Sequence, residues 1–190
     1  MADQSTRNRL ILRKTVVLVG MMGAGKTAVG RTLAAHLGVP FRDSDHEIEQ
    51  AANMSIAEIF ARDGEPFFRR KESQVIERLL DGTPLVLSTG GGAFMSEGNR
   101  RMISDKGVSV WLDAELPVLW NRVRHKDSRP LLRTPDPYGT LKALHETRAP
   151  VYALADITVP SEAGRSLDEM ARLVARRLYE TRPDVLETVP

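Results

Sequence analysis

The sequence predicts an α/β fold, a three-layer α/β/α sandwich with a central five-stranded parallel sheet. Two observations carry this prediction. Short apolar segments alternate along the chain with longer helical patterns, which is typical of parallel strands joined by crossover helices. A glycine-rich stretch, residues 20–27, directly follows the first apolar, β-branched segment and precedes a helical pattern.

The elements can be assigned in chain order. The expected strands cover residues 15–20, 40–43, 85–89, 108–113 and 156–159. Residues 28–37 predict a helix because their apolar residues recur at helical spacing, and Gly38 is placed to terminate it. Ser96 and Ser166 are expected to cap two later helices.

We expect one domain over residues 15–181, preceded by a flexible extension, residues 1–14, and followed by a C-terminal tail, residues 182–190. Two segments do not have the pattern of the sheet and its helices. Residues 44–81, approximately, form a long helical insertion that we expect to bind substrate. Residues 125–138, approximately, are rich in proline and arginine with little periodicity, which indicates an active-site lid; the alternative is a passive surface loop.

Composition excludes several classes of function. The 190 residues carry a net charge of +2 and only 5% aromatic residues, which argues against a nucleic-acid partner. No apolar run approaches the roughly 20 residues of a membrane span, and the N-terminus lacks the apolar segment of a secretory signal. The absence of cysteine excludes disulfides and thiolate chemistry and fits a cytoplasmic protein. We expect a monomer.

The stretch from Gly20 to Thr27, Gly-Met-Met-Gly-Ala-Gly-Lys-Thr, has the spacing of a phosphate-binding loop. Its glycines allow backbone N–H groups to approach a polyphosphate closely. Lys26 would meet the terminal phosphates, and the Thr27 hydroxyl is suited to Mg²⁺. The alternative is a glycine-rich turn between strand and helix that binds no ligand.

Two carboxylates follow the second expected strand, at Asp43 and Asp45. Strand carboxyl ends face the ligand crevice of an open parallel sheet, so both should lie near the phosphates. One would suit a water on Mg²⁺ and the other would accept the proton of a substrate hydroxyl. The alternative is that Asp45 caps the following helix. Ser88, at the end of the third strand, is a candidate hydrogen-bond partner of a Mg²⁺-bound water.

Two further segments carry candidate substrate contacts. Gly90, Gly91 and Gly92 leave N–H groups accessible at a strand end; the alternative is a flexible turn. Arg69 and Glu72 are three residues apart on a helix expected to start near residue 65. Their pairing either aims the arginine at an anionic substrate or is an ordinary helical salt bridge.

Two late arginines remain. Arg129, in the expected lid, is suited to stabilise a transferred phosphoryl group. Pro150 is expected to end a short helix and leave Arg148 at its terminus. Arg148 would then either bind substrate or serve as an ordinary C-terminal helix cation.

Together these motifs resemble the shikimate kinase family, which has a P-loop kinase fold. The resemblance covers roughly residues 16–178. It rests on the phosphate loop, Asp43-Ser44-Asp45, Ile59-Phe60 with Asp63-Gly64-Glu65, Phe68-Arg69-Arg70 with Glu72, Gly90-Gly91-Gly92, Arg129-Pro130-Leu131-Leu132 and Arg148-Ala149-Pro150-Val151-Tyr152.

The resemblance implies that ATP, with Mg²⁺, phosphorylates the 3-hydroxyl of shikimate, a step of aromatic amino-acid biosynthesis. The implied catalytic residues are Lys26, Asp45 and Arg129. The implied nucleotide contacts are Gly23, Ala24, Gly25, Lys26, Thr27, Ala28, Arg122 and Arg129. The implied substrate contacts are Asp45, Phe60, Phe68, Arg69, Gly90, Gly91, Gly92 and Arg148. The implied metal-site residues are Thr27, Asp43 and Ser88.

Two rival hypotheses remain open. Another small-molecule kinase of this fold, such as a gluconate kinase, would share the phosphate loop and the lid. A nucleotide-binding module without catalytic activity would bind ATP and turn over no substrate. The acidic and basic residues Asp45, Arg69, Arg129 and Arg148 favour catalysis over the second hypothesis.

Overall fold

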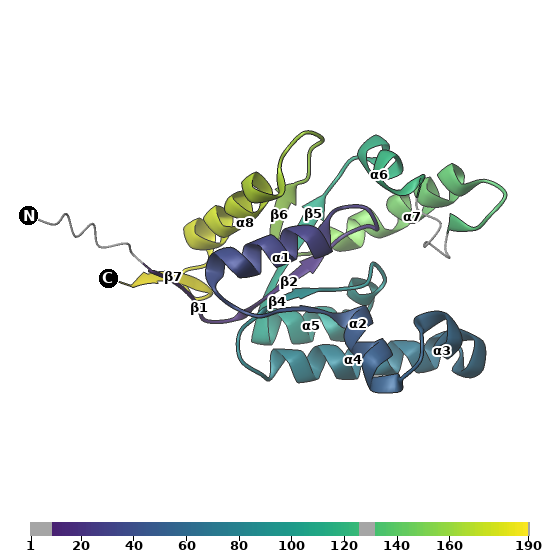
Figure 1. Ribbon diagram of the computed structural model, residues 1–190, viewed down its shortest axis with the longest axis horizontal. Helices are drawn as coiled ribbons and strands as arrows, with labels where there is room; N and C mark the ends of the chain where they lie inside the picture. The colour runs from purple at the N-terminus through teal and green to yellow at the C-terminus, as the bar shows by residue number, and fades with distance from the viewer. Residues whose placement is uncertain (1–8, 126–131, 190) are drawn as a thin grey trace, which may run out of the picture.

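The computed structural model describes residues 9–125 and 132–189. It confirms the predicted α/β sandwich with a five-stranded parallel sheet (Figure 1). The sheet order is β3-β4-β2-β5-β6, and all neighbouring strands are parallel. The strands are β2 (Thr15–Val19), β3 (Phe41–Asp43), β4 (Val86–Ser88), β5 (Gly107–Asp113) and β6 (Ile157–Pro160).

Helices cover both faces of this sheet. The helices of the described residues are α1 (Lys26–Leu37), α2 (Ser44–Ala52), α3 (Ile56–Asp63), α4 (Glu65–Leu80), α5 (Glu97–Lys106), α6 (Leu116–Val123), α7 (Pro137–Tyr152) and α8 (Leu167–Thr181), with a 3₁₀ turn η1 (Ala93–Met95). In Figure 1, α1 and α8 pack together on one face while α4 and α5 pack together on the other. None of the helices in the described residues is long and apolar enough to span a membrane.

The central strands form where the sequence offers continuous apolar runs. Every residue of β2 is buried, as are Val108, Val110 and Leu112 of β5. Burial on both faces requires such runs instead of alternation. Three expected helix boundaries hold: Gly38 ends α1 in the left-handed conformation, and the hydroxyls of Ser96 and Ser166 cap α5 and α8. Helix α1 begins at Lys26, two residues before the expected start.

The expectation of loose terminal tails was wrong for two segments. Strand β1 (Arg9–Leu12) pairs antiparallel with β7 (Leu186–Val189), so the two ends of the chain form a second, small sheet. Leu12 and Leu186 pair with each other in this sheet, and both side chains are buried. Arg13 forms an ion pair with Glu187 beside them. Each strand is short and its partner lies far away in the sequence, so neither segment carries a local signal of pairing.

We expect Leu186→Ala to lower the free energy of unfolding by about 2–4 kcal/mol, because it leaves a cavity beneath the terminal sheet. Chemical denaturation measures this value. The exposed neighbour Thr188 provides the control, and Thr188→Ala should change it by less than about 0.5 kcal/mol. If both variants change the free energy of unfolding equally, residues 186–189 do not contribute a buried side chain to the fold.

Helix α7 differs from its prediction at both ends. Pro150 lies inside the helix, which continues to Tyr152, so Arg148 is not the terminal residue that we expected. A proline so close to a helix end removes only one of the last backbone hydrogen bonds, and the helix tolerates this loss. The expected lid, residues 125–138, overlaps the first turn of α7, and residues 126–131 lie outside the described residues.

Candidate active site

The phosphate loop connects β2 to α1 at the carboxyl edge of the sheet. Gly23 and Gly25 have φ values of 82° and 94°, a left-handed region that favours glycine. The Lys26 ammonium is buried and donates to the carbonyls of Gly20 and Met21, at 2.7 and 2.9 Å. Because α1 begins at Lys26, the positive end of its dipole adjoins the loop, which therefore has the features of a polyanion site.

Other predicted nucleotide contacts also lie around this loop. Ala28 is exposed in the first turn of α1, and Ala24 is buried. Arg122, on α6, donates to the Gly23 carbonyl at 3.0 Å, and burial lowers its pKa. Arg129 lies outside the described residues, so its role stays a prediction.

Oxygen ligands gather beside the loop. The Thr27 hydroxyl donates to Oδ2 of Asp43 at 3.1 Å and lies 3.5 Å from the hydroxyl of Ser88. Carboxylate and hydroxyl oxygens of this kind fit the preference of Mg²⁺ for hard ligands, completed by phosphate and water. In the described part of the chain, no group of three His, Cys, Asp or Glu residues is placed to hold a metal ion.

Asp43 also caps α2, because its Oδ1 accepts from the backbone N–H groups of Asp45 and His46. The alternative that Asp45 is the cap was therefore wrong. Ser44 is the first residue of α2, which places the capping position one residue earlier, at Asp43. The carboxylate of Asp45 is consequently left available for the crevice.

The environment of Asp45 disfavours its ionised form. Burial raises its pKa to about 6, with a further increase from neighbouring Asp43 and an opposing effect from Lys26. A carboxyl with a pKa near neutrality that lies close to a phosphate loop is a candidate acid–base group. Because Lys26 affects the pKa of Asp45, the two side chains lie close together. The end of the second strand therefore adjoins the phosphate loop, as the sequence predicted.

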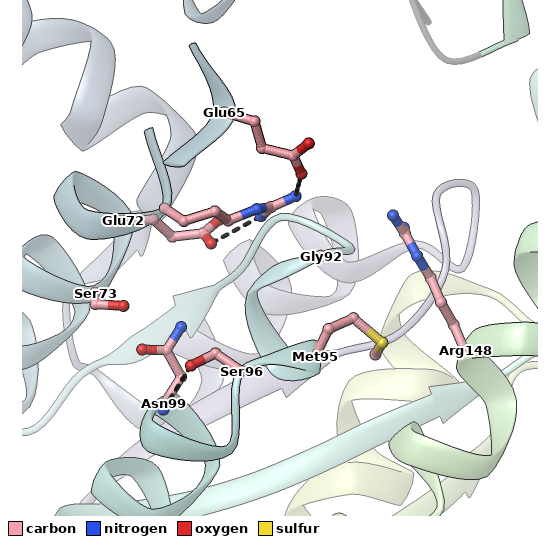
Figure 2. A pocket seen from close by; sticks show the side chains of 9 residues that line it. Glu65, Glu72, Ser73, Gly92, Met95, Ser96, Asn99 and Arg148 are labelled. Carbon is pink, nitrogen blue, oxygen red and sulfur yellow. Dashed lines mark hydrogen bonds and ion pairs between the residues drawn. The ribbon is translucent and has the colours of Figure 1, made fainter. Parts of the chain in front are cut away.

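Arg69 and Arg148 come from α4 and α7 and line one cavity of about 360 Å³. Nη1 of Arg69 donates to Oε1 of Glu72 at 2.8 Å, and the glutamate is buried, which raises its pKa. Figure 2 shows Glu65 and Glu72 on one side of the cavity and Arg148 on the other, with Gly92 between them. Two guanidinium groups facing one cavity suit a carboxylate ligand.

The triple glycine explains how these charged groups converge. A Cβ on Gly90 would lie 2.9 Å from Oδ1 of Asp45, and one on Gly91 would lie 3.0 Å from Nη1 of Arg148. A Cβ on Gly92 would overlap the guanidinium of Arg69. Each glycine thus leaves space for one charged side chain.

For the reaction that the resemblance implies, we expect Gly92→Ala to raise KM for shikimate about 10-fold or more by displacing the Arg69 guanidinium, whose charge-assisted hydrogen bonds are worth about 1.5–3 kcal/mol. KM for ATP should change little. Gly92 has a φ of −87°, so alanine fits the backbone and the melting temperature should remain near that of the wild type. Gly98→Ala is the matched control, because this position is exposed and a Cβ there would lie at an ordinary contact distance of 3.7 Å from the Ser96 hydroxyl. An unchanged KM for shikimate would contradict the placement of Arg69.

The predicted aromatic wall lies on α3 and α4. The ring centroids of Phe60 and Phe68 are 4.9 Å apart, and the Arg69 guanidinium carbon lies 5.2 Å from the Phe68 ring centroid. Phe68 is buried, while Phe60 is 37% exposed. The pair therefore offers an apolar surface beside the arginine.

Sequence reasoning missed several residues that hold the site in place. The Ser44 hydroxyl accepts from Gly90 N–H at 3.4 Å, and the Ser161 hydroxyl donates to the Ala24 carbonyl at 3.0 Å. Tyr152 donates to the Gly91 carbonyl at 2.5 Å. Ser44 and Tyr152 fall within recognisable motifs, but nothing in the sequence indicates their partners.

Comparison with known proteins agrees with this geometry. Residues 22–179 match the family model for shikimate kinase. A shikimate kinase of Cereibacter sphaeroides is 70% identical over 93% of this chain and 88% of that protein, and one of Ruegeria pomeroyi is 68% identical over 93% and 90%. A solved structure of shikimate kinase from Acinetobacter baumannii in complex with shikimate aligns with a TM-score of 0.82 and 36% identity, covering 89% of this chain and 94% of that one. The chain belongs to the shikimate kinase family.

Proposed function

We propose that this site transfers the γ-phosphoryl group of ATP to the 3-hydroxyl of shikimate, with ADP and shikimate 3-phosphate as products. One observation carries the proposal: Asp45 adjoins both the phosphate loop, through Lys26, and the triple glycine that lies against the two-arginine cavity. A donor phosphate and an acceptor alcohol therefore have adjacent places. Membership of the family supports the choice of substrate.

At the nucleotide end, the loop from Gly23 to Ala28 binds the phosphates through its backbone N–H groups. Lys26 interacts with the β- and γ-phosphates once it exchanges its loop carbonyl partners for them. Thr27, Asp43 and Ser88 provide the oxygen atoms for Mg²⁺, directly or through water. When bound, Mg²⁺ neutralises phosphate charge. Arg122 supports the nucleotide end. Arg129 lies outside the described residues, and its proposed role at the transferred phosphoryl group rests on the family resemblance alone.

At the acceptor end, Arg69 and Arg148 bind the shikimate carboxylate, and Glu72 holds Arg69 in position. Phe60 and Phe68 contact the ring. The backbone of Gly90, Gly91 and Gly92 contacts the substrate. These groups together orient the 3-hydroxyl toward Asp45.

The transfer needs positioning and charge neutralisation more than covalent catalysis. The hydroxyl oxygen forms a bond to the γ-phosphorus while the bond to the ADP oxygen breaks. Asp45 accepts the hydroxyl proton, and its pKa of about 6 leaves it mostly ionised at neutral pH but basic enough to take that proton. Lys26 stabilises the charge on the transferring group.

We also propose that the protein is a cytoplasmic monomer whose ligands are shikimate, ATP and Mg²⁺, without a nucleic-acid or membrane partner. Its near-neutral charge and low aromatic content support the part of this proposal that excludes a nucleic-acid partner.

A coupled ADP-release assay with shikimate, gluconate or a nucleoside monophosphate as acceptor tests the reaction. We expect turnover when shikimate is the acceptor and none with the other two acceptors. Turnover of gluconate without shikimate would support the gluconate kinase alternative. ATP binding without release of ADP for any acceptor would support the non-catalytic alternative.

A further inference from the structure

Tyr152, the last residue of α7, is buried at the back of the triple glycine. Its side chain is inaccessible to solvent, and its ring lies 6.0 Å from that of Trp111 on β5. The hydroxyl donates to the Gly91 carbonyl at 2.5 Å. This hydrogen bond joins α7 to the glycine turn that adjoins the substrate cavity.

Arg148 meets the same point. It precedes Tyr152 by four residues, so both side chains lie on one face of α7. A Cβ on Gly91 would lie 3.0 Å from Nη1 of Arg148 and 3.4 Å from the Tyr152 hydroxyl. Burial raises the pKa of Tyr152, and hydrogen bonding from Arg148 opposes this increase. The hydroxyl therefore stays protonated at neutral pH and interacts with both neighbours.

The two arginines are held in different ways. Arg69 forms ion pairs with Glu72 and Glu65. Among the ion pairs of residues 9–125 and 132–189, none includes Arg148, although it lines the same cavity. A long side chain without a carboxylate partner loses more conformational freedom when it binds an anion, unless another group orders it beforehand.

We propose that Tyr152 is a positioning residue that orders Arg148 against Gly91. It thereby prepares one half of the carboxylate clamp, which is the pair of guanidinium groups of Arg69 and Arg148. The Tyr152 hydroxyl orients Arg148 as the Glu72 carboxylate orients Arg69. It adds no negative charge that would compete with a substrate carboxylate. This inference rests on the proposed role of Arg148 as a ligand of shikimate.

The test is a double-mutant cycle of Tyr152→Phe and Arg148→Ala, read as KM for shikimate, KM for ATP and kcat. Tyr152→Phe keeps the buried ring and removes only the hydroxyl. We expect it to raise KM for shikimate about 3- to 10-fold, the size of a typical hydrogen bond, and to change KM for ATP less than about twofold. In the Arg148→Ala background, the same substitution should change KM for shikimate less than about twofold. Tyr179→Phe, on the exposed face of α8, is the matched control.

The other outcomes separate the two claims. If Arg148→Ala leaves KM for shikimate unchanged, the clamp assignment fails and the inference fails with it. If Arg148→Ala raises KM but Tyr152→Phe has no effect, or has the same effect with and without Arg148, only the positioning role is overturned. A parallel increase in KM for ATP would likewise overturn it, because it would indicate a general distortion of the sheet edge.

Discussion

Lys26→Ala is expected to reduce kcat by about 10³-fold, because the transferring phosphoryl group loses the cation that faces it. The structure supplies the reason for so large an effect. The ammonium is buried inside the loop and held by the carbonyls of Gly20 and Met21, so it meets the phosphates as a desolvated, pre-positioned charge. The ADP-release assay with saturating shikimate and saturating ATP measures this loss.

The control is Lys106→Ala, which removes an ammonium that pairs with Asp81 at the exposed end of α5. This variant should retain kcat within about twofold. Lys26→Ala should still bind shikimate, since the arginine cavity is formed by other elements. Near-native kcat in Lys26→Ala would refute the assignment of the loop as the catalytic phosphate site.

Asp45→Asn is expected to lower kcat by about 10²- to 10⁴-fold, the usual contribution of a positioned acid–base group. The amide is nearly isosteric but cannot accept the hydroxyl proton. ATP affinity should be largely retained, because the loop and the Mg²⁺ ligands are unchanged. Undiminished turnover in this variant would exclude Asp45 as the proton acceptor and as an essential orienting group.

The raised pKa of Asp45 makes two further measurements informative. In the wild type, kcat/KM for shikimate should fall as pH decreases through about 6, because Asp45 becomes protonated. The contribution of Asp45 to the free energy of unfolding should, in contrast, increase as pH decreases. Between the unfolded pKa of 3.8 and the folded pKa of about 6, the unfolded chain releases a proton that the folded protein retains, so the folded state loses stability as pH rises.

From about one pH unit above the folded pKa this destabilisation is complete, and Asp45→Asn removes it. The variant should therefore be more stable than the wild type at pH 8 by roughly 1–3 kcal/mol, and this difference should vanish near pH 3. Denaturant titrations at the two pH values measure it. Equal stability of both proteins at pH 8 would contradict the burial of a strained carboxylate at this position.

Much of the fold was predictable because its signals are local. The apolar runs 85–87 and 108–112 become buried strands, and the caps at Ser96 and Ser166 begin helices. The pairing of the two chain ends was not predictable, because β1 and β7 are short and depend on a distant partner. The passage of α7 through Pro150 was also missed, because the expectation that a helix ends before proline fails where the proline costs only one of the last backbone hydrogen bonds.

The candidate site divides in the same way. The phosphate loop, the two aspartates and the arginine pair could be named from residue type and spacing. Their mutual arrangement could not, because it depends on contacts between elements far apart in the chain. The sequence indicates that Gly90, Gly91 and Gly92 leave backbone accessible, but only the structure assigns each of them a charged neighbour. The same is true of Asp43, whose helix cap frees Asp45.

A crystal structure with ADP, Mg²⁺ and shikimate tests the central claim most directly, since that claim places a nucleotide and a carboxylated alcohol in adjoining halves of one site. We predict the β-phosphate in the loop beside Lys26, the shikimate carboxylate between Arg69 and Arg148, and the 3-hydroxyl within hydrogen-bonding distance of Asp45. Shikimate bound away from the two arginines, or with its 3-hydroxyl turned away from Asp45 and the nucleotide, would contradict the account.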